Sequence, residues 1–101
     1  MKKKTINKNK IRKECWNLDA AFIDWLNIHL KVFKKDAIKI VDLEFHKFNY
    51  NGEELTQLQI IDRLIQLTND LKTTNVWDQG YTGKQDEMLD LWKLVFPAMW
   101  W

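Results

Sequence analysis

Apolar residues recur at three- and four-residue steps over a long stretch near the start of the chain, which predicts an amphipathic helix over about residues 18–33. Asn17 precedes the stretch and is the expected N-cap. The main apolar stripe consists of Leu18, Phe22, Trp25, Leu26, His29, Leu30 and Phe33. Ala21, Ile28 and Val32 widen this stripe, so we expect the helix to contact neighbours on two sides.

A second amphipathic helix is predicted after residue 56. Thr56 and Gln59 form a T-x-x-Q capping box, and Leu55 is placed to pack onto Ile60 across the helix start. The expected buried face consists of Ile60, Ile61, Leu64, Ile65 and Leu71.

A third helix is predicted near the C-terminus, after a glycine-containing loop. Thr82 and Gln85 suggest another capping box, which would place Asp86 and Glu87 in the first turn. The expected core-facing residues are Met88, Leu91, Trp92 and Val95. Pro97 ends or kinks this helix because proline cannot continue the backbone hydrogen bonds.

The segment between the first two helices predicts a small β-hairpin. Val41, Leu43 and Phe45 alternate with polar residues, as in a half-buried strand. Asn51-Gly52 supplies the positive φ angles of a tight turn, and a change of phase predicts a bulge near Lys47. The return strand must be short. A helical spacing is also present, through Ile38, Val41, Phe45 and Phe48.

The predicted fold class is therefore α+β, mainly α, with about three helices packed with a small β-hairpin. A length of 101 residues corresponds to one domain. We expect a basic N-terminal arm over residues 1–14 and a single globular domain over residues 15–101. The single cysteine, Cys15, has no partner for an internal disulfide, which indicates a reducing compartment.

The charge is distributed unevenly along the chain. The arm contains seven cationic residues and no acid within residues 1–13: Lys2, Lys3, Lys4, Lys8, Lys10, Arg12 and Lys13. The remaining residues carry nine Lys or Arg against fourteen Asp or Glu, so the body is acidic. Such an arm can attract phosphate, anionic lipid or an acidic protein over a long range, or it can simply stay solvated.

The six tryptophans in so short a chain require an explanation. Helical periodicity predicts that most aromatic side chains are buried in the core. Past Pro97 we expect the chain to fold back, so that Met99, Trp100 and Trp101 cover the core. The alternative is that exposed rings, including Trp77 in the loop before the third helix, form a partner site.

Catalytic, metal and cofactor chemistry is poorly supported by the sequence. The three glycines do not form a phosphate-binding loop. Cys15, His29 and His46 are too scattered for a nucleophile–base pair or a structural zinc site. We therefore expect no enzyme activity, no cofactor and no metal. The N-terminal lysines are followed by polar residues and no long apolar run is present, so we expect a cytoplasmic protein without membrane contact.

Three segments, WNLDAAFIDWL, VDLEFHKFNYNGEE followed by TQ, and WKLVFPAMWW, together resemble a group of small, uncharacterised proteins encoded by phages and prophages of Gram-positive bacteria. The resemblance covers about residues 15–101. It implies no catalytic residues. It implies a cytoplasmic context in the bacterial host, in which small phage proteins often bind host proteins, including proteins of defence systems.

The leading hypothesis is a non-enzymatic, phage-encoded protein-binding accessory, with an inhibitor of host defence of the anti-CRISPR type as the narrower candidate. Its expected partner-binding residues are Asp86, Glu87, Asp90, Trp77 and Trp101. The alternatives are a nucleic-acid-binding module that uses the basic arm, and a homo-oligomeric phage structural or assembly protein. The sequence does not fix the partner or the oligomeric state.

Overall fold

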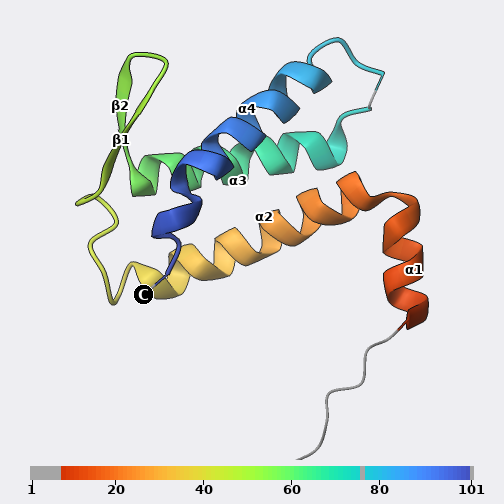
Figure 1. The fold of residues 1–101 in the computed structure, drawn as a ribbon, viewed down its shortest axis with the longest axis horizontal. Helices are drawn as coiled ribbons and strands as arrows, with labels where there is room; N and C mark the ends of the chain where they lie inside the picture. The colour runs from red at the N-terminus through yellow and green to blue at the C-terminus, as the bar shows by residue number, and fades with distance from the viewer. Residues whose placement is uncertain (1–7, 76, 101) are drawn as a thin grey trace, which may run out of the picture.

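A computed structural model describes residues 8–75 and 77–100 of the chain (Figure 1). The elements are α1 (Lys8–Trp16), α2 (Leu18–Ala37), β1 (Lys47–Tyr50), β2 (Glu53–Thr56), α3 (Gln57–Thr73), α4 (Tyr81–Val95) and a 3₁₀ turn, η1 (Phe96–Ala98). The α+β, mainly helical class is confirmed, although the described part of the chain contains four α-helices instead of about three.

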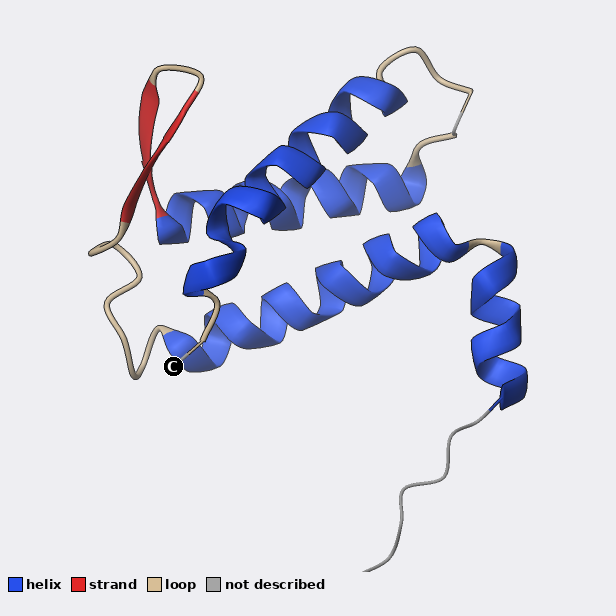
Figure 2. Ribbon diagram, in the orientation of Figure 1, coloured by secondary structure: helices blue, strands red, loops and turns tan. Residues whose placement is uncertain are grey.

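Helix α3 is the central element, because it packs against α2 on one side and α4 on the other (Figure 2). The hairpin and α1 lie at opposite ends of the molecule. The Cα trace measures 46 × 42 × 18 Å along its principal axes, so the helices form a thin slab. A slab leaves much of each helix at the surface.

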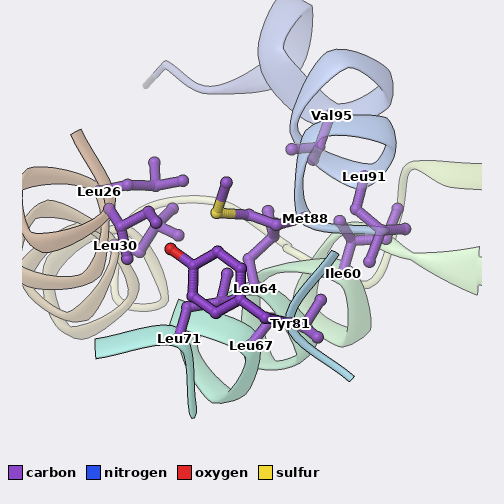
Figure 3. Close-up of a cluster of buried hydrophobic side chains, with 11 residues drawn as sticks. Leu26, Leu30, Ile60, Leu64, Leu67, Leu71, Tyr81, Met88, Leu91 and Val95 are labelled. Atoms are coloured by element: carbon purple, nitrogen blue, oxygen red, sulfur yellow. The ribbon is translucent and has the colours of Figure 1, made fainter. Parts of the chain in front are cut away.

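The main core lies where α2, α3 and α4 meet (Figure 3). Helix α2 contributes Leu26 and Leu30, α3 contributes Ile60, Leu64, Leu67 and Leu71, and α4 contributes Tyr81, Met88, Leu91 and Val95. These side chains are buried. The prediction is confirmed for Leu26, Leu30, Ile60, Leu64, Leu71, Met88, Leu91 and Val95. Leu67 and Tyr81 were not expected in the core, and Leu18, Trp25 and His29 of the apolar stripe predicted for α2 are exposed.

The predicted starts of α2 and α3 are correct. Helix α3 has the capping box: the Gln59 amide donates to the Thr56 hydroxyl at 3.1 Å, and the Thr56 amide donates to the Gln59 side chain at 2.8 Å. Helix α2 begins at Leu18 but extends to Ala37, and the side chain of Asn17 makes no capping hydrogen bond.

The predicted start of α4 is wrong. The helix begins at Tyr81, with Gly80 as a cap that has no side chain, so Thr82 is inside the first turn. Its first turn contains no acid, and Asp86 and Glu87 lie further along the helix. The Tyr81 side chain, in the first turn of the helix, is buried in the core.

The hairpin forms, but its first strand lies later than predicted. Residues 41–46 are turn and loop, and β1 begins at Lys47. The pairing runs regularly from Lys47 with Thr56 to Tyr50 with Glu53, without a bulge at Lys47. The Asn51-Gly52 turn is confirmed, with φ angles of 51° and 79°.

Loop 38–46 is attached to α3 instead of to a strand. The amide of Leu58 donates to the carbonyl oxygen of Leu43 at 2.9 Å, and the amide of Gln57 donates to that of His46 at 3.0 Å. Leu43 is buried in a second, smaller cluster with Ala37 and Ile61. The alternation of apolar and polar residues at 41–46 therefore does not mark a strand. Leu43 alone anchors the loop in the core, while Phe45 is exposed.

The expectation that most aromatic rings are buried is wrong for the tryptophans. Within residues 8–75 and 77–100, Trp16, Trp25, Trp77 and Trp100 are exposed, and Trp92 is half-buried. Helical periodicity places an indole on an apolar face, but in a thin slab some apolar faces have no neighbouring element to cover them.

Candidate protein-binding surface

The chain after α4 is held against the start of α3. Gln57 is buried, and its side-chain amide donates to the carbonyl oxygen of Ala98 at 3.0 Å. The Met99 side chain packs against both buried clusters. These contacts fix the position of the segment that contains Phe96 and Pro97.

Met99 is at the centre of an inverse γ-turn. Its backbone angles are φ −85° and ψ 68°, and the amide of Trp100 donates to the carbonyl oxygen of Ala98 at 2.9 Å. The side chain of Met99 enters the core, whereas the indole of Trp100 is 73% exposed. The expected lid is therefore correct for Met99 and wrong for Trp100, and Trp101 lies outside the described residues.

One hollow of about 530 Å³ lies between loop 38–46 and the C-terminal segment. Its lining residues are mostly apolar: Val41, Asp42, Phe45, His46, Phe48, Gln57, Leu94, Pro97, Ala98 and Trp100. The rings of Phe45 and His46 meet edge to face, with centroids 5.4 Å apart. This hollow is wide enough to accept a large apolar side chain.

A second hollow, of about 370 Å³, lies between α2 and the end of α4. Its lining residues are Trp25, Leu26, His29, Leu30, Val32, Phe33, Trp92, Phe96 and Met99. Trp25 stacks on His29 with centroids 4.1 Å apart, and Trp92 contacts Phe96 edge to face at 5.2 Å. Both α2 and α4 pack on α3, and the hollow lies between them.

Phe45, Phe96 and Trp100, which border these two hollows, are called the C-terminal aromatic surface here. Their exposed fractions are 74%, 61% and 73%. Large exposed apolar patches mark interaction sites, and buried aromatic anchors supply much of the energy of protein interfaces. The arrangement suits a partner that presents apolar side chains to the two hollows.

The predicted acidic residues lie on α4, and two of them are engaged with other elements. Arg63 on α3 makes a bidentate pair with Glu87, with N–O distances of 2.5 and 3.0 Å. The hydroxyl of Tyr50 on β1 donates to Asp90 at 3.4 Å. Asp86 is exposed. The cluster therefore carries less net negative charge than three free carboxylates would.

These contacts change the proton affinities of two groups. Partial burial, followed by the nearby charges of Asp90 and Glu87, raises the pKa of the Tyr50 hydroxyl above its usual value. The hydrogen bonds that the Arg63 guanidinium donates to the Glu87 carboxylate raise the pKa of Arg63. The bidentate contact between Arg63 and Glu87 links α3 to α4.

The remaining predicted partner-binding residues are Trp77 and Trp101, and neither belongs to the C-terminal aromatic surface as defined above. Trp77 is 88% exposed in the loop before α4, and Trp101 lies outside the described residues. Of the basic arm, Lys2, Lys3 and Lys4 also lie outside them. Lys8, Lys10, Arg12 and Lys13 are exposed on α1, a helix without any buried residue.

The three residues considered for nucleophile or metal chemistry are on different elements. Cys15 is exposed on α1, His29 stacks on Trp25 in α2, and His46 lies beside Phe45 in the loop. Across residues 8–75 and 77–100, no three His, Cys, Asp or Glu side chains are grouped to hold a metal ion. In the same residues, no helix is long and apolar enough to cross a membrane.

Sequence reasoning missed Phe45 and Phe96. Phe45 was expected on the buried face of a strand, and Phe96 was not singled out. One signal was available: Pro97 ends the helical pattern directly after Phe96, so this ring falls where α4 stops covering the core.

No protein-family model matches the chain, and the searches of curated proteins and of solved structures found no match. The geometry described above therefore carries the functional argument.

Proposed function

We propose that this chain is a non-enzymatic protein-binding accessory whose partner contacts the C-terminal aromatic surface. The observation that carries the proposal is the exposure of Phe45, Phe96 and Trp100 beside two apolar hollows. Leaving three large rings in water forgoes several kcal/mol of burial, on the order of 1.5–3 kcal/mol each. A partner that covers them recovers this free energy.

The surface is also rigid enough for specific binding. Gln57 fastens the backbone at Ala98, and Met99 anchors the segment in the core. Preorganised side chains lose little conformational entropy on association, which favours affinity. The basic arm adds long-range attraction toward an acidic partner, which raises the association rate.

The narrower role is a proposal that rests on the resemblance to phage and prophage proteins. In that role the chain is made in the cytoplasm of the bacterial host and inhibits a defence system, of which anti-CRISPR inhibition is one form. Asp86, Glu87 and Asp90 would then compete for a nucleic-acid groove of the target. Because Glu87 is paired with Arg63, Asp86 and Asp90 are the carboxylates that support this version best.

Affinity capture from a lysate of a Gram-positive host, followed by mass spectrometry, tests the proposal. We expect the wild-type chain to retain a host protein that Phe96→Ser/Trp100→Ser loses. Leu89→Ser is the matched control, because Leu89 is an exposed apolar residue of α4 that lines neither hollow. Retention of the same protein by the double variant contradicts the proposed site.

Two further variants separate the surfaces. Trp77→Ser tests the loop before α4, and Asp86→Lys tests the acidic version. If only Asp86→Lys loses the partner, binding is by charge and the aromatic surface is not the site.

A second candidate function is nucleic-acid binding through the arm. The observation that favours it is that α1 has no buried residue and presents Lys8, Arg12 and Lys13 to solvent. We expect binding to DNA or RNA at low salt with a steep salt dependence, and its loss in Lys8→Glu/Arg12→Glu/Lys13→Glu. Absence of binding at low salt contradicts this candidate.

A further inference from the structure

Helix α2 has a second apolar face that is largely exposed to solvent, although Ala21 within it is partly buried. Its members are Leu18, Ala21, Trp25, Ile28 and Val32, called the α2 stripe here. Leu18, Trp25, Ile28 and Val32 are each about half or more exposed. At 3.6 residues per turn, the stripe lies roughly opposite the buried face that contains Leu26 and Leu30.

The spacing of the α2 stripe is that of a helix-pairing seam. The steps from Leu18 to Val32 are three, four, three and four residues, and the stripe is about 21 Å long at 1.5 Å per residue. No charged residue interrupts it. Such a seam fits a second helix of the same spacing better than an irregular surface.

We propose that two copies of this chain associate through the α2 stripe, with the two α2 helices antiparallel. The register that we propose packs Trp25 against Ile28 of the partner subunit and Ala21 against Val32 of the partner subunit. The small alanine side chain thus faces a larger one, which helps the two surfaces interdigitate.

Charge supports this register and orientation. Asp24 and Lys31 border the stripe on the side of α3, where Lys72 contacts Asp24 at 2.8 Å and Asn69 accepts from Lys31 at 3.3 Å. The antiparallel register places Asp24 beside Lys31 of the partner subunit, and its two-fold axis repeats the pair. If the partner helix slides by seven residues so that the N-terminal halves of the two α2 helices overlap, Asp24 lies beside Asp24 of the partner subunit and Val32 is left uncovered.

A parallel pair is disfavoured by the arm. It would bring both N-terminal segments, each with seven cations in residues 1–13, to the same end of the dimer. The antiparallel pair places them at opposite ends, which reduces their repulsion. One helix pair buries less than the roughly 800 Å² per partner of a standard interface, so we expect a weak, concentration-dependent dimer.

This inference does not rest on the proposed binding of a host protein. Trp25 and Val32 also line the second hollow, but Ala21 and Ile28 do not. Variants at these two positions therefore separate dimerisation from partner binding.

Sedimentation velocity from about 10 µM to about 1 mM measures the dimer. We expect the mass to rise from monomer to dimer, and Ile28→Lys to raise the dissociation constant by about tenfold or more. Leu89→Lys is the matched control, because Leu89 and Ile28 are 47% and 49% exposed on different helices. Circular dichroism verifies that both variants fold.

Disulfide formation tests the orientation in a Cys15→Ser background. Ala21→Cys/Val32→Cys should form a covalent dimer on mild oxidation, because the two positions face each other only between antiparallel copies. Ala21→Cys alone should form no disulfide-linked dimer, since the equivalent positions are about 16 Å apart along the helix axis.

The inference is overturned by a monomer at all concentrations, by an unchanged dissociation constant in Ile28→Lys, or by disulfide cross-linking of Ala21→Cys alone. Phe96→Ser/Trp100→Ser should still dimerise. Loss of dimerisation in that variant would show that the copies meet at the aromatic surface, which also overturns it.

Discussion

Asn27 on α2 donates its side-chain amide to the hydroxyl of Thr68 on α3 at 2.8 Å, in the centre of an otherwise apolar contact. The same amide donates to Asn69 at 2.8 Å. Both Asn27 and Thr68 are fully buried, while the carbonyl oxygen of the Asn27 side chain has no partner. A buried polar contact of this kind fixes the register of α2 on α3 at a cost in stability.

Two substitutions of Asn27 separate the stabilisation by its hydrogen bonds from the cost of its unpaired carbonyl oxygen. Asn27→Ala should lower the free energy of unfolding by about 2 kcal/mol, because it leaves a void and removes the hydrogen bonds. Asn27→Leu fills most of the volume and removes the unpaired oxygen, while Thr68 still donates to the Leu64 carbonyl at 2.8 Å. We expect it to be the less destabilising change in urea unfolding. Equal losses would show that the hydrogen bonds dominate.

Met99 and Trp100 should contribute very differently to the free energy of unfolding. Trp100 is exposed, so Trp100→Ser should change the free energy of unfolding by no more than about 0.5 kcal/mol. Met99→Ala should lower it by about 1–2 kcal/mol, since its side chain packs against both buried clusters. Thermal unfolding of the two variants measures this. A large loss in Trp100→Ser would mean that its ring covers the core after all.

Much of the fold follows from local sequence, whereas the parts that were predicted wrongly depend on contacts between elements that are distant along the chain. The spacing of Ile60 and Leu64, the capping box at Thr56 and the Asn51-Gly52 turn each act over a few residues, so the sequence predicts α3 and the hairpin turn. Loop 38–46 is different, because Leu43 bonds to α3, an element that lies further along the chain. Three alternating residues do not distinguish a strand from a loop with one anchored side chain.

The candidate surface was harder to predict for the same reason. Periodicity identified two apolar sides of α2, but only the arrangement of whole helices decides which side is covered. Trp25 lies on the uncovered side, and Leu26 on the covered one. Likewise, the γ-turn at Met99 decides that Met99 enters the core and Trp100 does not. The charged candidates were visible in the sequence, whereas the Arg63–Glu87 pair depends on the packing of α3 on α4.

The acidic residues of α4 should respond differently to charge reversal. Glu87→Lys removes the bidentate pair with Arg63 and places two cations together, so we expect it to lower the free energy of unfolding by about 1 kcal/mol. Asp86→Lys should have little effect, because Asp86 is exposed. Urea unfolding at low and high salt measures both, and the loss in Glu87→Lys should shrink with salt. Equal behaviour of the two variants would contradict this.

Tyr50 should make stability depend on pH in the alkaline range. Its pKa is raised in the folded state, chiefly by burial and then by the charge of Asp90, so the unfolded chain loses the hydroxyl proton first. The stabilisation is therefore fully present below about pH 10, the ordinary tyrosine value, and is lost as pH rises through the folded-state pKa. Tyr50→Phe should remove this part of the pH dependence in urea unfolding.

Asp90→Asn tests the cause of the shift. The substitution removes one of the charges that disfavour the phenolate, so we expect the folded-state pKa of Tyr50 to fall toward its ordinary value without loss of the fold. Absorbance titration of the phenolate near pH 10 measures this, with Tyr50→Phe to identify the signal of Tyr50. Asp86→Asn is the control, since Asp86 is not among the groups that shift this pKa. An unchanged Tyr50 pKa in Asp90→Asn would show that Asp90 does not contribute to the shift, which would then come from burial and Glu87.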